Sequence, residues 1–177
     1  MSTLTLEGIN AMTPQAFLVA LGGVFEHSPW IAESAFAARP FASVAALHEA
    51  MVDAVKRAPR ERQLALLNAH PELAGKEAQA GALTSSSSAE QASVGLNALS
   101  RDDMQMLSRR NREYRERFGF PFIIAVRMHT KASIFSEFER RLGREVDTEL
   151  DACLEQVFLI TRFRLETLVV AKHGSAT

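Results

Sequence analysis

The residue types best suited to proton transfer are concentrated between His70 and Gln91, in the stretch HPELAGKEAQAGALTSSSSAEQ. His70 precedes Pro71 at the end of one helical pattern, and Glu90 stands at the start of the next. Imidazole and carboxylate groups can donate, accept or relay a proton near neutral pH, so these positions suit general acid–base catalysis. The structural alternative is that His70 is an ordinary hydrogen-bonded residue at a helix end, without a catalytic role. In that case Glu90 only interacts favourably with the dipole of its helix.

A run rich in hydroxyl groups, Thr84 to Ser88, precedes a helical pattern over residues 89–99. With Ser87 or Ser88 as the N-cap, Glu90 and Gln91 fall in the first turn, where free backbone N–H groups can bind an anion. The chain has no Gly-x-Ser-x-Gly turn, which disfavours a serine hydrolase. Ligand pairs at metal spacing and glycine-rich phosphate loops are also absent from the sequence, which disfavours a metal site and a nucleotide cofactor.

Arg164 lies in the longest helical pattern, which we expect to begin with Asp147 as its cap and to run to about Lys172. An arginine on an apolar face needs a counter-charge or an anionic ligand. We therefore expect Arg164→Leu to weaken ligand binding at little cost in stability, whereas Arg162 points away from that face. The residues that share the face with Arg164 are Leu150, Cys153, Leu154, Val157, Thr161 and Leu168.

The elements that must position these residues are expected to be helices. Helix-start signals stand at Thr13-Pro14, Ser28-Pro29, Ser43, Ser100 and Thr130, and a short helix is expected over residues 60–68. Residues 120–126 (FPFIIAV) alone have strand composition, and one short run cannot form a sheet, so we expect a buried extended segment or a helix start. The sequence thus predicts an all-α fold: a single-domain bundle of about eight helices over residues 1–177.

The amino-acid composition excludes some partners and locations but does not indicate a particular function. Lys and Arg total 20 against 21 Asp and Glu in 177 residues, so no global charge draws the protein to nucleic acid or to an anionic membrane. The single cysteine, Cys153, fits a reducing compartment and a buried position better than a nucleophile. The sequence has no apolar stretch long enough to span a bilayer and no secretory signal, and we expect a cytoplasmic protein.

Four short motifs follow one another along the chain: HPEL at residues 70–73, Leu83-Thr84 with the Ser87, Glu90-Gln91 and Gly95-Leu96 positions, FGFPFI at 118–123, and RFRL at 162–165. Ser-Pro-Trp at 28–30 and Arg-Pro-Phe at 39–41 precede them. In this order the motifs resemble those of the 2-oxo-4-hydroxy-4-carboxy-5-ureidoimidazoline (OHCU) decarboxylase family, over nearly the whole chain. Glu72 stands where the family commonly has Asp, and the peroxisomal tail of many eukaryotic members is missing, which suggests a bacterial-type cytoplasmic enzyme.

The resemblance implies an all-helical fold and a decarboxylation of OHCU to (S)-allantoin, in urate catabolism, without a cofactor. It implies that His70 is the catalytic histidine and that Glu90 contacts the substrate; which of the two delivers the final proton stays open. The implied substrate contacts are Pro71, Ser87, Glu90, Gln91, the backbone of Phe122, Ile123, Ile124, Ala125 and Val126, and Arg164.

Two alternatives remain open at this point. A non-enzymatic helical adaptor would bind a partner helix in a groove and would not need His70, Glu90 and Arg164 to converge. A lyase for a related ureide would keep the site and change the substrate. The expected partner is a small-molecule substrate rather than nucleic acid or a membrane, and a homodimer is suggested by the resemblance only.

Overall fold

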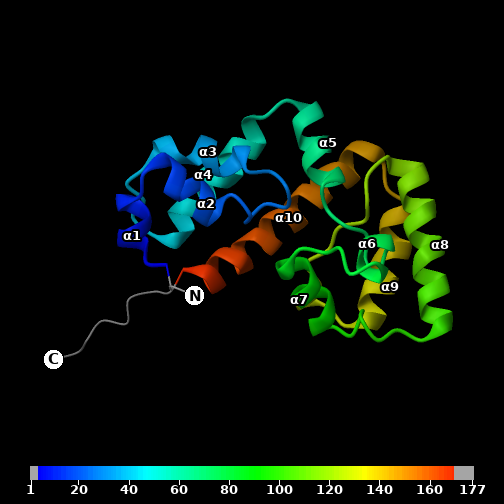
Figure 1. The fold of residues 1–177 in the computed structure, drawn as a ribbon. Coiled ribbons are helices and arrows are strands. Elements are labelled where there is room, and N and C mark those ends of the chain that lie inside the picture. Colours follow the sequence, from blue (N-terminus) through cyan, green and yellow to red (C-terminus); the bar gives the residue numbers. More distant parts are fainter. Residues whose placement is uncertain (1–3, 170–177) are drawn as a thin grey trace. The chain divides into compact units, whose positions relative to one another are not determined.

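The computed structural model describes residues 4–169, and over these residues the regular structure is helical, as expected (Figure 1). A lone parallel bridge joins Leu4 to Val169. The elements are α1 (Leu6–Ala11), α2 (Pro14–Leu21), α3 (Trp30–Ala35), η1 (Phe36–Ala38), α4 (Val44–Arg57), α5 (Arg60–Asn68), α6 (Lys76–Gln79), α7 (Ser85–Ser93), α8 (Arg101–Phe118), η2 (Val126–Met128), α9 (Lys131–Leu142) and α10 (Val146–Leu168), where η marks a 3-10 helix.

The chain divides into two compact units. The terminal unit holds the described residues up to Leu66 and from Phe158 onward, and the central unit holds residues 67–157. Helices α5 and α10 each contribute residues to both units. The predicted site residues from His70 to Val126 belong to the central unit, whereas Arg164 belongs to the terminal unit.

Most of the predicted helix starts are confirmed by their capping bonds. The side chains of Thr13, Ser43, Ser100 and Thr130 each accept a hydrogen bond from a backbone N–H in the first turn of the following helix. Helix α8 ends at Gly119, whose φ of 79° is left-handed and therefore suits glycine. These local signals were sufficient because each cap satisfies donors that the helix itself leaves open.

Four boundaries differ from the sequence prediction. Helix α1, capped by Thr5, was not expected. Helix α3 begins beside Pro29 without a side-chain cap from Ser28. Helix α10 begins at Val146, so Asp147 lies in its first turn rather than at the cap, and the predicted end near Lys172 falls outside the described residues. The cap of α7 is Thr84, because any of five consecutive hydroxyl residues can cap and the earliest one starts the helix.

The terminal unit is built around α3, which packs against α2 and α4. Phe17, Ile31 and Met51 are fully buried between these helices. Arg39 holds the connection after α1: its guanidinium donates to the Met12 carbonyl at 2.7 Å and stacks on the Phe36 ring at 3.5 Å. The hydrophobic interior of this unit thus rests on helix pairs that are close in sequence.

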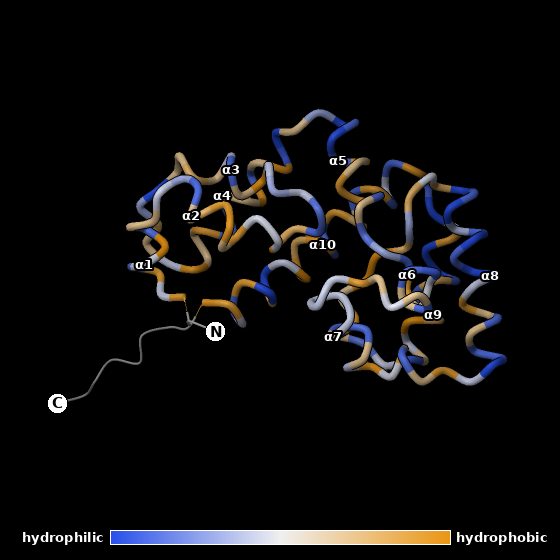
Figure 2. Tube along the Cα trace, in the orientation of Figure 1, coloured by the Kyte–Doolittle hydropathy of each residue, from blue (hydrophilic) through white to orange (hydrophobic). Residues whose placement is uncertain are grey.

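The central unit packs α8 against α9 around an aromatic cluster. The Tyr114 ring lies 5.3 Å from that of Phe122 and 6.0 Å from that of Phe138, with the rings edge to face. Figure 2 draws α8 mostly in blue, since most of its residues are polar or charged and only a few face this cluster. Residues 120–125 run through the cluster as a buried extended segment, which confirms one of the two sequence expectations for them.

Candidate active site

His70 opens a tight loop, residues 70–75, that is separated from the end of α5 by Ala69. Its backbone N–H donates to the Leu67 carbonyl at 3.1 Å, which closes the turn at the end of the helix. The His70 residue is 6% exposed, and Pro71 is half-buried. Helix α5 ends at Asn68, two residues before His70, in keeping with the proline at position 71, and His70 belongs to the central unit.

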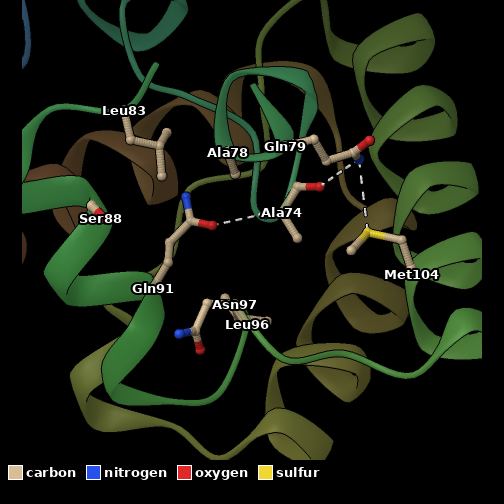
Figure 3. Close-up of a pocket in the computed structure, with 9 residues that line it drawn as sticks. All are labelled: Ala74, Ala78, Gln79, Leu83, Ser88, Gln91, Leu96, Asn97 and Met104. Carbon is tan, nitrogen blue, oxygen red and sulfur yellow. Dashed lines mark hydrogen bonds between the residues drawn. The ribbon is translucent and has the colours of Figure 1, made fainter. Parts of the chain in front are cut away.

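Helix α7 holds the middle of this loop through Gln91. The Gln91 side-chain oxygen accepts a hydrogen bond from the Ala74 N–H at 2.8 Å, a contact that Figure 3 shows. Ala74 has a φ of 46°, a left-handed conformation that a non-glycine residue adopts at a cost of about 1–2 kcal/mol. The Gln79 amide donates to the Ala74 carbonyl at 3.1 Å, so both backbone groups of this strained residue are bonded to glutamine side chains.

Helix α8 holds the same loop from a second side. Asn111 is 4% exposed and donates through Nδ2 to the Leu73 carbonyl at 2.9 Å. Arg115 bonds the Glu72 carboxylate at 2.8 Å. Glu72 therefore has a charged partner on α8. Together, α7 and α8 fix the backbone of the loop that carries His70.

The predicted substrate contacts on α7 share one face of that helix. Ser87, Glu90 and Gln91 are three and four positions apart, which places them on adjacent turns of the same side. Ser87 and Gln91 are buried, at 4% and 6% exposure, and Glu90 is half-buried. Because α7 starts at Ser85, Glu90 and Gln91 lie in its second turn, and the expectation that they sit beside the open N–H groups of the first turn is wrong.

The extended segment ends against α7. Phe122, Ile123, Ile124, Ala125 and Val126 are all buried, and η2, which begins at Val126, packs on α7. Several backbone groups of the segment are already bonded within the central unit, among them the Ala125 and Val126 carbonyls, which accept from Met128 and His129. The Ala125 N–H donates to the Gln156 side-chain oxygen at 2.9 Å, and the Ile123 carbonyl accepts from Arg141 at 2.8 Å.

Arg164 is held by a buried carboxylate in the terminal unit. Its Nη1 atom lies 2.8 Å from Glu26 Oε2 and donates to the Val24 carbonyl at 3.2 Å. The two side chains are only 8% and 2% exposed. The sequence argument required a counter-charge or a ligand, and Glu26 is that counter-charge. Leu168, which was expected on the same buried face, is 38% exposed, whereas the other predicted members of that face are buried.

A pocket of about 180 Å³ lies beside the clamped loop in the central unit (Figure 3). Gln91 connects this pocket with the predicted site. Its side chain lines the pocket and also bonds Ala74 in the loop that carries His70. The lining side chains are uncharged: Ala74, Ala78, Gln79, Leu83, Ser88, Gln91, Leu96, Asn97 and Met104. Such a lining suits a neutral, amide-like molecule better than an ion.

Residues 4–169 contain no group of three His, Cys, Asp or Glu side chains arranged as metal ligands, and no helix among them has the length and apolar character to cross a membrane. Cys153 is fully buried, as predicted, and burial raises the pKa of its thiol. The sequence analysis missed the side chains that hold the site backbone, among them Asn111, Arg115 and Arg141. Arg141 carried a readable signal, since it follows Ile134 and Phe138 on the apolar face of α9.

Comparison with known proteins agrees with this architecture. Residues 10–166 match the family model described as OHCU decarboxylase. The chain is 44% identical over 165 residues to the 2-oxo-4-hydroxy-4-carboxy-5-ureidoimidazoline decarboxylase of Haloferax volcanii, covering 93% of this chain and 96% of that protein. It is 39% identical to the uric acid degradation bifunctional protein PucL of Bacillus subtilis, covering 95% of this chain but only 33% of the relative. A crystal structure of (S)-allantoin synthase superposes with a TM-score of 0.74 at 26% identity, over 94% of this chain and 54% of that chain. The chain therefore belongs to the OHCU decarboxylase family.

Proposed function

We propose that this protein decarboxylates OHCU to (S)-allantoin in urate degradation. The observation that carries the proposal is the family match over residues 10–166, combined with a central unit in which the His70 loop is bonded to the helix that bears Ser87, Glu90 and Gln91. The relatives that the chain matches nearly end to end are named for this activity.

The proposed reaction needs an acceptor for the electron pair that is left when carbon dioxide departs. The bond between the ring carbon and its carboxylate breaks, and the electron pair moves into the conjugated C=N bond of the substrate ring. This leaves an enol, with a double bond between the two ring carbons and a proton taken up by the ring nitrogen. A proton then adds to the neighbouring, ureido-bearing ring carbon, and the hydroxyl group loses its proton, so that the carbon that lost the carboxylate becomes a ring carbonyl of allantoin. Because the ring itself takes up the electrons, the protein has to bind, orient and protonate the substrate, and the proposal includes no cofactor.

We assign the proton chemistry to His70 and Glu90. His70 lies in a loop whose backbone is fixed on two sides, so its imidazole can present a proton from a defined direction. Delivery from one face of the ring would set the S configuration of the product. Glu90 would bond the substrate and orient the imidazole, and the final proton comes from one of these two groups.

We assign binding roles to the remaining predicted residues. Pro71 shapes the site beside His70, and Ser87 contributes a hydroxyl from the same face of α7 as Glu90. Backbone amides of residues 122–126 would bond the polar ring. Arg164 would pair with Glu26 and at the same time donate a charge-assisted bond of about 1.5–3 kcal/mol to the substrate. For Gln91, the bond to Ala74 supports a role in holding the loop in addition to any substrate contact.

His70→Asn tests the assignment against a matched control. His27→Asn makes the same substitution at an exposed histidine in the terminal unit, whose φ of 46° asparagine tolerates well. With freshly prepared OHCU and circular dichroism at an allantoin band, wild-type protein and the control should produce (S)-allantoin. His70→Asn should lose about 10²–10⁴-fold in kcat/KM while remaining folded. Near-normal turnover by folded His70→Asn would remove the catalytic role, and no excess of one enantiomer with wild-type protein would remove the proposed activity.

The same assay separates the two alternatives. A panel of hydantoins and ureides tests for a lyase with a related substrate, and a helical adaptor would turn over none of them. We further propose a single functional domain, a cytoplasmic location, a small-molecule substrate with neither nucleic acid nor membrane as partner, and a homodimer. Sedimentation velocity of the purified protein would test the last of these.

A further inference from the structure

Arg141 is a fully buried arginine in the central unit, at 2% exposure, and the proposed mechanism does not use it. Its guanidinium lies 2.7 Å from Oε1 of Glu149, a residue with no exposed surface. Tyr114 donates its hydroxyl to the same carboxylate, and Arg144 bonds the other carboxylate oxygen at 3.2 Å. Burying this many charged groups is costly unless their positions are fixed, so the cluster holds Arg141 in one orientation.

The Arg141 guanidinium connects this cluster to the extended segment. Its Nη1 atom donates to the Ile123 carbonyl at 2.8 Å, and its Cζ atom lies 4.4 Å from the centre of the Phe122 ring. The third direction of the guanidinium is taken by Cys153, with Nη2 at 3.2 Å from the sulfur. The planar guanidinium thus donates to three partners: Glu149, the Ile123 carbonyl and Cys153. A lysine, with a single nitrogen, cannot reproduce this geometry.

Fixing the Ile123 carbonyl also fixes the next amide. In a trans peptide the C=O of one residue and the N–H of the following residue lie in one plane and point in opposite directions. The Ile124 N–H therefore points away from Arg141. Within residues 4–169 this N–H has no hydrogen-bond acceptor, although Ile124 is only 3% exposed, whereas the neighbouring Ala125 N–H is bonded to Gln156. A buried N–H without an acceptor is rare, and an acceptor atom of a bound ligand would satisfy it.

We propose that Arg141 is a positioning residue that aims the Ile124 N–H at the substrate, and that Glu149 and Tyr114 hold Arg141 for this task. The inference rests on the proposed function insofar as residues 122–126 bind the substrate. Within that segment it assigns a substrate contact to the Ile124 N–H, whose peptide plane is fixed by the bond from Arg141 to Ile123, and it excludes Ala125, whose N–H is already bonded.

A paired substitution tests this without leaving a buried charge behind. Arg141→Met combined with Glu149→Gln removes both charges and the donor to Ile123. The matched control is Arg140→Met with Glu137→Gln, because this neighbouring ion pair lies on the same helix with side chains 55% and 26% exposed. The readouts are kcat and KM with OHCU and amide hydrogen exchange of residues 120–126.

The test variant should be folded, with KM at least tenfold higher and faster exchange confined to residues 122–126, and the control should match wild type. A folded test variant with wild-type KM and kcat would overturn the proposal. A purely structural role would lower the active fraction and leave KM unchanged, which also overturns it. Should the paired variant not fold, Arg141→Lys decides in the same way, since the ammonium preserves the charge beside Glu149 and loses the bond to Ile123. If wild-type protein has no OHCU activity, the proposed function is wrong. Amide exchange of residues 122–126 in the variant then tests separately whether Arg141 orders this segment, and unchanged exchange would overturn that part of the proposal.

Discussion

Replacing Arg164 by leucine should destabilise the protein strongly, contrary to the expectation from sequence. The substitution leaves the Glu26 carboxylate, 2% exposed, without the guanidinium that lies 2.8 Å from it. Breaking a buried ion pair from one side costs about 3–5 kcal/mol. For a chain of this length such a loss lowers Tm by roughly 6–20 °C. The comparison variant is Arg162→Leu, because Arg162 pairs with Glu166 on the surface, at 62% and 50% exposure, and should change stability by about 1 kcal/mol or less.

The double variant Arg164→Leu with Glu26→Leu separates the charge pair from the apolar packing. Removing both partners leaves no buried charge, so most of the stability lost in Arg164→Leu should return. Urea unfolding of the wild type, both single variants and the double variant gives the coupling free energy directly. Equal stability of Arg164→Leu and wild type would refute the reasoning, since it would mean that Glu26 loses nothing when its partner is removed.

The double variant also tests whether Arg164 binds substrate. If the arginine only neutralises Glu26, the folded double variant keeps wild-type KM. If it also bonds OHCU, KM rises about tenfold or more even though stability is restored, because a charge-assisted bond of about 1.5–3 kcal/mol is lost. The single variant cannot make this distinction, since its unfolding and its loss of binding occur together.

Two further predictions concern other polar contacts. Gln91→Leu removes the acceptor of the strained Ala74 N–H, and we expect a loss of about 1–3 kcal/mol in the free energy of unfolding together with faster amide exchange in residues 70–75; unchanged exchange there would contradict the clamp. His48 lies in the terminal unit beside Thr161, and burial lowers its pKa below the ordinary value of 6.5, while Phe158, Arg162, Glu166 and Glu49 supply smaller effects. The unfolded chain therefore binds more protons than the folded protein just below pH 6.5, and the free energy of unfolding falls as the pH drops from about 7 toward 5. In thermal melts, His48→Gln should reduce the dependence of Tm on pH in this range. An equally steep acid limb in that variant would assign the slope to other groups.

The sequence was sufficient for the features that local physics decides. Capping residues such as Thr13 and Ser43 mark their helices because each satisfies open donors within four residues. The buried face of α10 followed from its spacing, and Arg164 stood out on that face. A search for charged residues on apolar helix faces would also have selected Arg141 in α9, where it follows Ile134 and Phe138.

The rest depended on contacts between distant parts of the chain, which a single sequence does not reveal. Glu26 and Arg164 are 138 residues apart, so the identity of the counter-charge was not visible. Asn111 reaches across 38 residues to Leu73, and such a polar residue in the middle of a charged helix looks like ordinary surface. The predicted cap of α7 was wrong for a local reason: five adjacent hydroxyl residues can each cap a helix, and the sequence does not distinguish among them.

The loop that carries His70 is fastened largely by carboxamides, from Gln79, Gln91 and Asn111. Carboxamides do not gain or lose protons anywhere in the range where an imidazole titrates. Acidifying or alkalinising the solution around neutrality would thus leave the scaffold of this loop unaltered. A rate profile measured across that range would accordingly report the ionisation of the reacting groups themselves, uncomplicated by a change of shape in the loop that presents the histidine.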